Sequence, residues 1–371
     1  MQDALIEQLC VSPIRSLQLQ RRPYPHHPSL QAWDSADLLL LNELKQADLL
    51  ERTSLLVNDQ FGALACNLSR WQPRLWLDSA VEILACQHNL ELNQLAELQM
   101  VAQHQLPPQA EQVLIKIPRS SALLDWQLAV LNQQLPLGTQ VWLAGMVKHL
   151  GRAHQQVIEQ RLSHCFASRI EKKAKFWSGR TQAQNSLPTN KLLRLESPWQ
   201  LALHNHPGLY SRDSIDPGAR CLLEHLHLAP QAGKVLDLCA GNGILGMAYQ
   251  RLQPQARLQY SDASSAALIS CQQSLAANGL TGLCHHTDGL LHLDKDFELI
   301  LCNPPFHQHN SVSTDTAKQL FTQARAHLKP KGQLLVVANR HLPYHPLLKS
   351  RYPKVKSLAK HPKFSLYLAG S

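Results

Sequence analysis

The sequence predicts an α/β protein made of two consecutive domains, each with a parallel sheet flanked by helices. Two observations carry this prediction: apolar runs of strand length alternate with helical patterns in both halves, and the same landmarks return in the same order. At 371 residues the chain also suits two domains better than one. We expect a first domain at residues 1–180, a linker at 181–196 and a second domain at 197–371.

The second half contains an apolar strand, an acidic residue and a loop with two alternate glycines. These features lie in Lys234–Gly246, where Asp237 precedes Gly241 and Gly243 and apolar residues at helical spacing follow. Glycines let the backbone approach a ligand closely, and the free N–H groups at the helix start suit an anionic group. The segment therefore predicts a site for a nucleotide-like cofactor.

Two further carboxylates follow at strand–helix spacing. The next strand, residues 256–261, leads to Asp262, where a carboxylate can bind ribose hydroxyls. After a helix at 265–278, a short segment ends at Asp288, which is placed to meet an adenine edge. We expect both carboxylates to belong to the cofactor site.

The most informative motif follows the apolar run Phe297–Cys302, which we expect to be a buried strand. It reads Asn303-Pro304-Pro305-Phe306, and its prolines make a stiff turn because they lack an N–H group and have a fixed φ. The turn aims the Asn303 carboxamide and the Pro304 carbonyl at one small volume beside an aromatic ring. Two acceptors and a π-face suit a planar group with an exocyclic amine, such as adenine, guanine, cytosine or a carboxamide. An ordinary strand-ending turn is the alternative for this motif alone.

The order of these features distinguishes the site from a dinucleotide-binding fold. The glycine loop alone is weak evidence, because Rossmann dinucleotide-binding folds carry one too, and Cys239 occupies a position where a further glycine is expected. The order of acid, glycine loop, two further acids and Asn-Pro-Pro-Phe resembles the class I S-adenosylmethionine-dependent methyltransferases that methylate exocyclic amines. The resemblance implies a Rossmann-like fold with S-adenosyl-L-methionine as the cofactor. The residues expected to bind it are Asp237, Cys239, Gly241, Gly243, Asp262 and Asp288.

Composition limits the other classes of function. The chain has no apolar run of membrane-spanning length and its first residues do not resemble a signal peptide, so we expect no membrane association. Nine scattered cysteines without a CxxC pair indicate reduced thiols and a cytoplasmic protein rather than a disulfide framework. The twenty histidines include HxH pairs without a matched second pair, so we expect no metal site.

The net charge of +9 is concentrated in two stretches. From Lys318 to Lys363 there are eleven Lys and Arg and no acidic residue, and Lys148–Arg180 holds eight against two Glu. A charge run is often only a solvated face, but here the asymmetry adjoins the half that carries the chemical motifs. It favours a polyanionic partner such as RNA.

The first half repeats the landmarks of the second with the chemistry changed. Residues 54–64 fall where a copy of the glycine-loop segment would lie, 75–78 match the strand ending at Asp262, and 113–118 match the strand before Asn303. Both halves then carry a helix with a Cys followed seven residues later by an Asn. The first copy has one glycine in its loop and Lys116 in place of Asn303, and a lysine only donates hydrogen bonds. We expect this copy to keep the fold without cofactor binding or catalysis.

Segments outside these motifs narrow the resemblance to the RsmC/RlmG family of rRNA guanine-N2 methyltransferases. They are residues 29–37 (SLQAWDSAD), 303–307 (NPPFH) and 337–344 (VANRHLPY), and the similarity covers essentially the whole chain. It implies two tandem Rossmann-like class I methyltransferase domains, the N-terminal one degenerate, that methylate the N2 amine of one guanine in 23S rRNA. The implied catalytic residues are Asn303, Pro304 and Phe306, and the implied substrate-binding residues are Pro305, His307 and Arg340.

Three alternatives stay open on the sequence alone. The same chemistry could act on 16S rRNA, or on another amine such as adenine N6 or a protein glutamine. The third is an RNA-binding ribosome-assembly factor without turnover, against which the complete set of motif residues argues. The basic C-terminal stretch favours a nucleic acid over a protein substrate.

Overall fold

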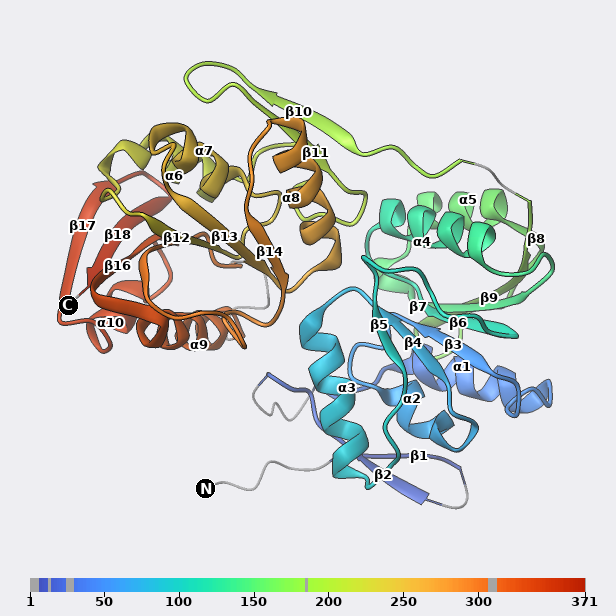
Figure 1. Cartoon of the computed structure of the whole chain (residues 1–371). Helices are drawn as coiled ribbons and strands as arrows, with labels where there is room; N and C mark the ends of the chain where they lie inside the picture. Colours follow the sequence, from blue (N-terminus) through green and yellow to red (C-terminus); the bar gives the residue numbers. More distant parts are fainter. Residues whose placement is uncertain (1–6, 13–14, 25–29, 184–185, 306–311, 371) are drawn as a thin grey trace. The chain divides into compact units, whose positions relative to one another are not determined.

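The computed structural model describes residues 7–12, 15–24, 30–183, 186–305 and 312–370. The chain forms two units, residues 1–189 and 190–371, and each has its own sheets and core (Figure 1). Each unit holds a seven-stranded sheet and a separate two-stranded hairpin. The predicted α/β fold with two tandem domains is therefore confirmed.

The second unit begins with a hairpin and continues as alternating strands and helices. Its strands are β10 (Lys191–Leu195), β11 (Leu201–Asn205), β12 (Lys234–Leu238), β13 (Arg257–Asp262), β14 (Leu283–His286), β15 (Phe297–Cys302), β16 (Leu328–Asn339), β17 (Lys354–Lys360) and β18 (Phe364–Gly370). Its helices are α6 (Pro217–Glu224), η3 (Leu226–Leu228), α7 (Ile244–Leu252), α8 (Ser265–Ala277), α9 (Val312–His327) and α10 (Tyr344–Lys349). The main sheet has the order β14-β13-β12-β15-β16-β18-β17, parallel except for β18, which runs antiparallel to both of its neighbours.

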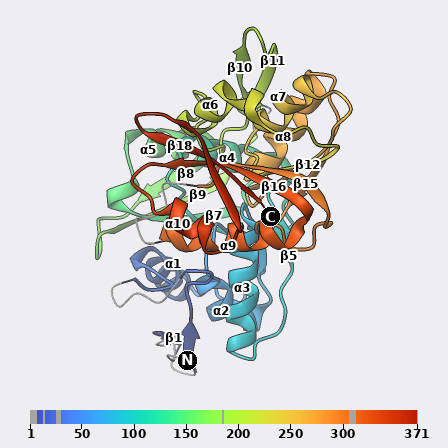
Figure 2. The ribbon, with the colours of Figure 1, turned by 90° about the vertical axis from the view of Figure 1, so that its left-hand side faces the viewer.

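Alternate residues of the central strands belong to two different apolar layers. Val235 and Leu299 pack with α6, α7 and α8, whereas Leu236 and Ile300 pack with α9 and α10. Figures 1 and 2 show these two groups of helices on opposite faces of the sheet. Because a parallel sheet buries both of its faces, successive residues of its central strands are apolar. This explains why residues 297–302 form a nearly continuous apolar run.

The first unit follows the same plan. Its strands are β1 (Glu7–Ser12), β2 (Arg15–Leu19), β3 (Ser54–Val57), β4 (Arg74–Leu77), β5 (Met100–Ala102), β6 (Gln112–Lys116), β7 (Gln140–Met146), β8 (Leu162–Ala167) and β9 (Ala174–Thr181). Its helices are α1 (Ser35–Gln46), α2 (Ala63–Leu68), η1 (Ser69–Trp71), α3 (Ala80–Leu92), α4 (Ser121–Gln134), η2 (Val147–His149) and α5 (Arg152–Arg161). The sheet order, β5-β4-β3-β6-β7-β9-β8, matches that of the second unit strand by strand.

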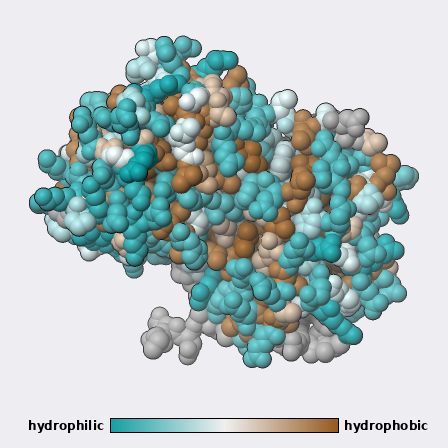
Figure 3. All heavy atoms as spheres, viewed as in Figure 1, coloured by the Kyte–Doolittle hydropathy of each residue, from teal (hydrophilic) through white to brown (hydrophobic). Residues whose placement is uncertain are grey.

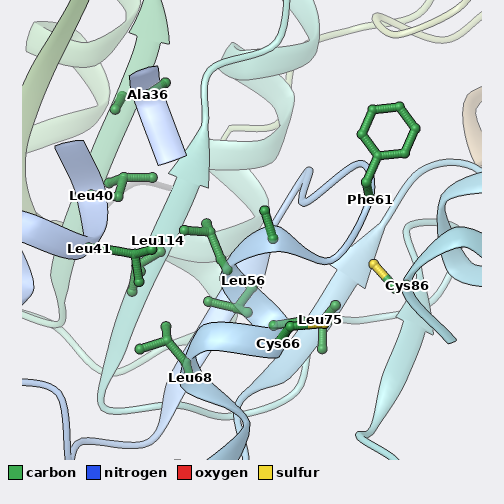
Figure 4. Close-up of a cluster of buried hydrophobic side chains, with 14 of the residues drawn as sticks. Ala36, Leu40, Leu41, Leu56, Phe61, Cys66, Leu68, Leu75, Cys86 and Leu114 are labelled. Atoms are coloured by element: carbon green, nitrogen blue, oxygen red, sulfur yellow. The ribbon is translucent and has the colours of Figure 1, made fainter. Parts of the chain in front are cut away.

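The core of the first unit is also divided between the two faces of its sheet. Leu56, Leu75 and Leu114, from three neighbouring strands, lie in one apolar cluster with Leu40 and Leu41 of α1 (Figure 4). The alternate strand residues pack instead with α4 and α5. The first unit is thus fully folded around its own apolar core.

One asparagine in each unit holds the hairpin against a helix end. Asn93 exchanges two hydrogen bonds of 2.8 and 2.7 Å with the backbone of Gln18. Asn278 exchanges two of 2.9 and 2.7 Å with the backbone of Ala202. The repeat therefore extends from strand order to individual side-chain contacts. In the second hairpin, β10 occupies residues 191–195 of the segment that we expect to be a linker and pairs with β11.

The large apolar side chains lie mainly in the core clusters, and hydrophilic side chains cover most of the face drawn in Figure 3. Within the described part of the chain, no helix is both long and apolar enough to span a membrane. The same residues contain no group of three His, Cys, Asp or Glu side chains that could hold a metal ion.

Candidate active site

The predicted site residues that the structure describes lie along the carboxyl edge of the second unit's sheet. In the parallel register Leu238, the last residue of β12, pairs with Ser261 of β13 and with Cys302 of β15. The segments that follow these residues carry the glycine loop, Asp262 and Asn303. Because the carboxyl ends of parallel strands lie at one edge, three motifs far apart in the sequence become neighbours. Such an edge is where open α/β sheets bind ligands.

Asp237 connects β12 to the helix that follows the glycine loop. Its Oδ2 accepts a hydrogen bond of 2.7 Å from the N–H of Gly246. Burial raises the pKa of Asp237 to about 8. Its Oδ1 is buried and has no hydrogen-bond partner among the described residues. The Asp237 carboxyl thus stabilises the loop conformation through Oδ2, and its Oδ1 has no hydrogen-bond partner among the described residues.

The two loop glycines have different roles. Both have positive φ, 55° at Gly241 and 81° at Gly243. A Cβ at Gly243 would lie 2.7 Å from the Sγ of Cys271, so this glycine allows α7 and α8 to pack closely. A Cβ at Gly241 would have no atom within 4 Å. Gly241 therefore faces open space, as expected where a ligand approaches a backbone.

Cys239 adopts a left-handed φ of 60°, a conformation that favours glycine. A hydrogen bond with the Cys302 thiol and burial raise the pKa of Cys239 well above its usual value. The Cys239 side chain is thus turned toward the end of β15. The left-handed backbone explains why a glycine would suit this position, although the chain has a cysteine here.

Asp262 supports the glycine loop from β13. Its Oδ2 accepts a hydrogen bond of 2.9 Å from the N–H of Gly241, and its Oδ1 accepts one of 2.9 Å from the N–H of Ser264. Burial raises the pKa of Asp262. Asp288 lies beyond β14, half-buried, where Nε2 of Gln319 donates to its Oδ2 at 3.4 Å and burial raises its pKa. Both carboxylates lie at or just beyond the ends of strands on the same side of β12.

Asn303 directly follows β15, and its amide nitrogen donates a hydrogen bond of 2.9 Å to Oδ1 of Asp216. Its own Oδ1 is buried and has no partner among the described residues. Pro304 is buried and Pro305 is half-buried. Two other residues expected at the site, Phe306 and His307, lie outside the described residues.

Arg340, expected to bind substrate, lies just after β16 and is exposed. Its backbone N–H donates to the carbonyl of Lys363 at 3.0 Å, and its guanidinium lies 3.5 Å from the carbonyl of Pro362. These contacts place Arg340 beside the turn between β17 and β18. That turn belongs to the same carboxyl edge as Asn303, because β18 begins opposite the end of β16.

Two contacts at this edge involve residues that the motifs do not single out. Asp216 caps α6 by accepting from the N–H of Ala219 at 3.0 Å. An Asp followed by Pro at the first helical position is a helix-start signal, so the cap could have been found from the sequence. Asn242, in the glycine loop, donates to Oδ1 of Asn205 at 2.8 Å and so ties the loop to the end of β11.

The corresponding edge of the first unit has lost almost every one of these groups. In the sheet of the first unit, Leu56 of β3 pairs with Leu114 and Leu75. In the second unit, Asp237 of β12 pairs with the residues at the equivalent positions, Leu301 and Tyr260. Following this register, the first-unit counterparts of Asp237, Gly241, Asp262, Asp288 and Asn303 are Leu56, Gln60, Leu77, His104 and Lys116. The sequence comparison aligns Asp78 with Asp262, but the strand pairing shifts the match by one residue. Asp78 corresponds to Ala263, because Ser79 and Ser264 cap the equivalent helices α3 and α8.

Comparisons with known proteins agree with this architecture. The model of the RLMG N-terminal domain matches residues 7–183, and that of the methyltransferase small domain matches residues 200–368. The ribosomal RNA large subunit methyltransferase G of Ectopseudomonas mendocina is 39% identical, covering 95% of this chain and 97% of the relative. The chain belongs to the ribosomal RNA large subunit methyltransferase G family. The family member of Pseudomonas aeruginosa (strain UCBPP-PA14) is 38% identical, covering 98% of this chain and 99% of the relative.

A solved structure shows the same fold over the whole length of this family member. It is the 16S rRNA N2-guanine methyltransferase RsmC of T. thermophilus, in complex with AdoMet and guanosine. The TM-score is 0.73 at 22% identity, and the match covers 99% of this chain and 98% of that one. The two-unit fold is therefore shared with a solved methyltransferase.

Proposed function

We propose that this protein transfers a methyl group from S-adenosyl-L-methionine to the N2 amine of one guanine in 23S rRNA. Membership in a family of large-subunit rRNA methyltransferases supports the substrate. The observation that carries the choice of an exocyclic amine is the arrangement of Asn303, whose buried Oδ1 has no partner among the described residues. With an rRNA substrate, we expect the protein to act in the cytoplasm.

The carboxyl edge of the second unit has the groups that S-adenosylmethionine requires. Open space beside Gly241 allows the cofactor to approach the backbone, and Asp262 retains acceptor capacity for ribose hydroxyls beyond its backbone hydrogen bonds. Asp288 is within the same row of strand ends and would accept from the adenine amine. Asp237 and Gly243 would act indirectly, by holding the loop. When bound, the cofactor supplies a methyl group on a positively charged sulfur.

The chain's own contribution to the reaction is to present and activate the amine. A guanine N2 amine is a weak nucleophile because its lone pair is delocalised into the ring. Hydrogen bonds from its two N–H groups to Oδ1 of Asn303 and to the carbonyl of Pro304 would favour a pyramidal nitrogen. They also strengthen as positive charge develops on nitrogen, so they stabilise the transition state more than the ground state. Holding the amine in line with the methyl group lowers the entropic part of the barrier.

The RNA must bring an unpaired or flipped-out guanine to this edge. The exposed Arg340 would contact a phosphate, and Pro305 would line the base pocket. From the sequence we also expect Phe306 to stack on the base and His307 to contact the RNA. The basic stretches in both units would hold the surrounding RNA by its phosphates.

The test is to incubate the purified chain with methyl-labelled S-adenosylmethionine and rRNA from a strain that lacks the gene. We expect label in 23S rRNA, recovered as N2-methylguanosine by mass spectrometry of the nucleosides. Label in 16S rRNA or at adenine N6 would contradict the substrate assignment. No label in any rRNA, with RNA binding retained, would favour the assembly factor without turnover.

A further inference from the structure

Asp216 connects the start of α6 to the residue that would accept hydrogen bonds from the substrate amine. One oxygen, Oδ1, accepts from the N–H of Ala219 at 3.0 Å and from the amide nitrogen of Asn303 at 2.9 Å. The first of these contacts caps a helix, which explains an Asp before Pro217. Capping does not explain the second contact, which reaches a residue 87 positions further along the chain.

The contact with Asp216 decides which end of the Asn303 amide faces the site. A carboxylate only accepts hydrogen bonds, so only the nitrogen end of the amide can face it. The oxygen end must then point the other way, and this is the Oδ1 atom that is buried without a partner among the described residues. A charge-assisted hydrogen bond also polarises the amide and makes its oxygen a stronger acceptor.

The first unit contains an equivalent contact between a capping Asp and the residue at the end of a strand, but that residue, Lys116, offers no acceptor oxygen. Asp34 caps α1, as Asp216 caps α6, and its Oδ1 lies 3.3 Å from the ammonium of Lys116. Lys116 also donates to Oδ2 of Asp37 at 2.6 Å. A contact between the capping Asp of the unit's first helix and the residue at the carboxyl end of β6 or β15 is therefore common to both units. It leaves an acceptor oxygen only where that residue is Asn303.

We propose that Asp216 is a positioning residue for methyl transfer: it orients Asn303 so that Oδ1 accepts from the substrate amine, and it strengthens that acceptor. This inference rests on the proposed function, because it assigns Asn303 to an amine. Asp216 itself contacts neither the base nor the cofactor in this scheme.

Three variants separate positioning from helix capping. Asp216→Ser keeps a capping hydroxyl but is too short to hold Asn303, and Asp216→Asn keeps an oxygen that accepts from both N–H groups. Asp34→Ser makes the same change at the equivalent cap of the first unit. For each variant, single-turnover and steady-state methylation, S-adenosylmethionine affinity by calorimetry, and the melting temperature are measured alongside the wild type.

We expect kcat of Asp216→Ser to fall about 10- to 100-fold, the effect of losing a hydrogen bond to a charged group, with unchanged KM for RNA and unchanged cofactor affinity. Asp216→Asn should recover most of this loss, and Asp34→Ser should keep the wild-type kcat. A wild-type kcat in Asp216→Ser would overturn the inference, as would a loss of cofactor affinity or an equal loss of kcat in Asp34→Ser. Failure of the proposed function is seen separately, as wild-type protein that does not methylate guanine.

Discussion

At the carboxyl edge of the second unit, Asp237 and Asn303 each keep a buried oxygen without a partner among the described residues. At the same edge of the first unit, Leu56 lies in an apolar cluster (Figure 4), and Lys116 is neutralised by Asp34 and Asp37. The two edges share strand order, register and a capping Asp, so their difference does not come from the fold. It comes from a few side chains. In the first unit two carboxylates hold Lys116, although Oδ1 of Asp37 also has no partner among the described residues, and in the second unit Asn303 keeps an acceptor oxygen.

This difference shows which parts of a duplicated domain are under structural constraint. The apolar strand residues, the hairpin asparagines Asn93 and Asn278, and the glycines Gly62 and Gly243 keep the same environment in both units. Their contacts are internal, so each copy needs them for stability. Groups that would touch a ligand lack that constraint, and in the first unit their counterparts are Gln60, Leu77, His104 and the ion-paired Lys116.

The largest effect is expected from removing the acceptor in the second unit. Asn303→Ala should lower kcat by about 10²- to 10³-fold, typical of removing one preorganised hydrogen bond to a transition state, while S-adenosylmethionine and RNA still bind. Lys116→Ala is the matched variant in the first unit. It leaves the buried Asp37 without its cation, so it should destabilise the fold by about 3 kcal/mol but retain kcat. Near wild-type turnover in Asn303→Ala would show that the motif is only a turn.

A second comparison concerns cofactor affinity. Asp262→Ala removes the carboxylate that holds Gly241 and is expected to bind ribose, so S-adenosylmethionine affinity should fall by about 10- to 100-fold. Asp78→Ala, in the first unit, should leave affinity unchanged. Calorimetry of the two variants measures both. An unchanged affinity in Asp262→Ala would remove this residue from the site.

A third comparison concerns RNA binding by the basic hairpins of the two units. The β8–β9 turn exposes Arg169, Lys172 and Lys173, and the β17–β18 hairpin exposes Lys354, Lys356 and Lys363. Changing either triplet to Gln should weaken RNA binding several-fold and reduce the log–log salt slope by about 0.7–0.9 for each phosphate that the variant no longer neutralises. Filter binding at several salt concentrations gives the slope. A triplet whose removal leaves the slope unchanged is only a solvated surface.

The smallest effect is expected from a buried carboxyl of the first unit. Burial raises the pKa of Asp59 from 3.8 to about 7, so the folded state holds its proton over a range where the unfolded state has lost it. Stability should therefore fall as the pH rises from about 4 to 7. Asp59→Asn keeps an acceptor for the N–H of Ala65 but does not ionise. Its melting temperature should exceed that of the wild type by a few degrees at pH 8, and the gap should narrow at pH 4. An equal gap at both pH values would contradict this explanation.

Local patterns in the sequence were sufficient to locate strands β12, β13 and β15 and the glycine loop of the second unit. Residues 297–302 and the glycine loop are predicted correctly because burial on both faces and left-handed turns leave signals within a few residues. The alignment of Asp78 with Asp262 fails because a one-residue shift between strands changes no local pattern. The pairing of β3 with β4 and the equivalent caps Ser79 and Ser264 reveal it.

The contact between Asp216 and Asn303 could not be predicted from spacing either. The helix cap leaves a clear local signal, but its second partner depends on how α6 packs beside the sheet. The same holds for the ion pair of Lys116 with Asp34 and Asp37. The sequence shows that Lys116 cannot accept a hydrogen bond. It does not show that Asp34 and Asp37 form ion pairs with Lys116 at this edge of the sheet.

The most direct test of the difference between the units is the number of S-adenosylmethionine molecules bound per chain. Titration calorimetry of the full-length protein should give one site, because only the second unit has Asp262, Gly241 and the open space beside it. The Asp262→Ala variant should then lose this single binding event without revealing another. A stoichiometry of two for the wild type, or one remaining site of unchanged affinity in the variant, would contradict the assignment of cofactor binding to the second unit alone.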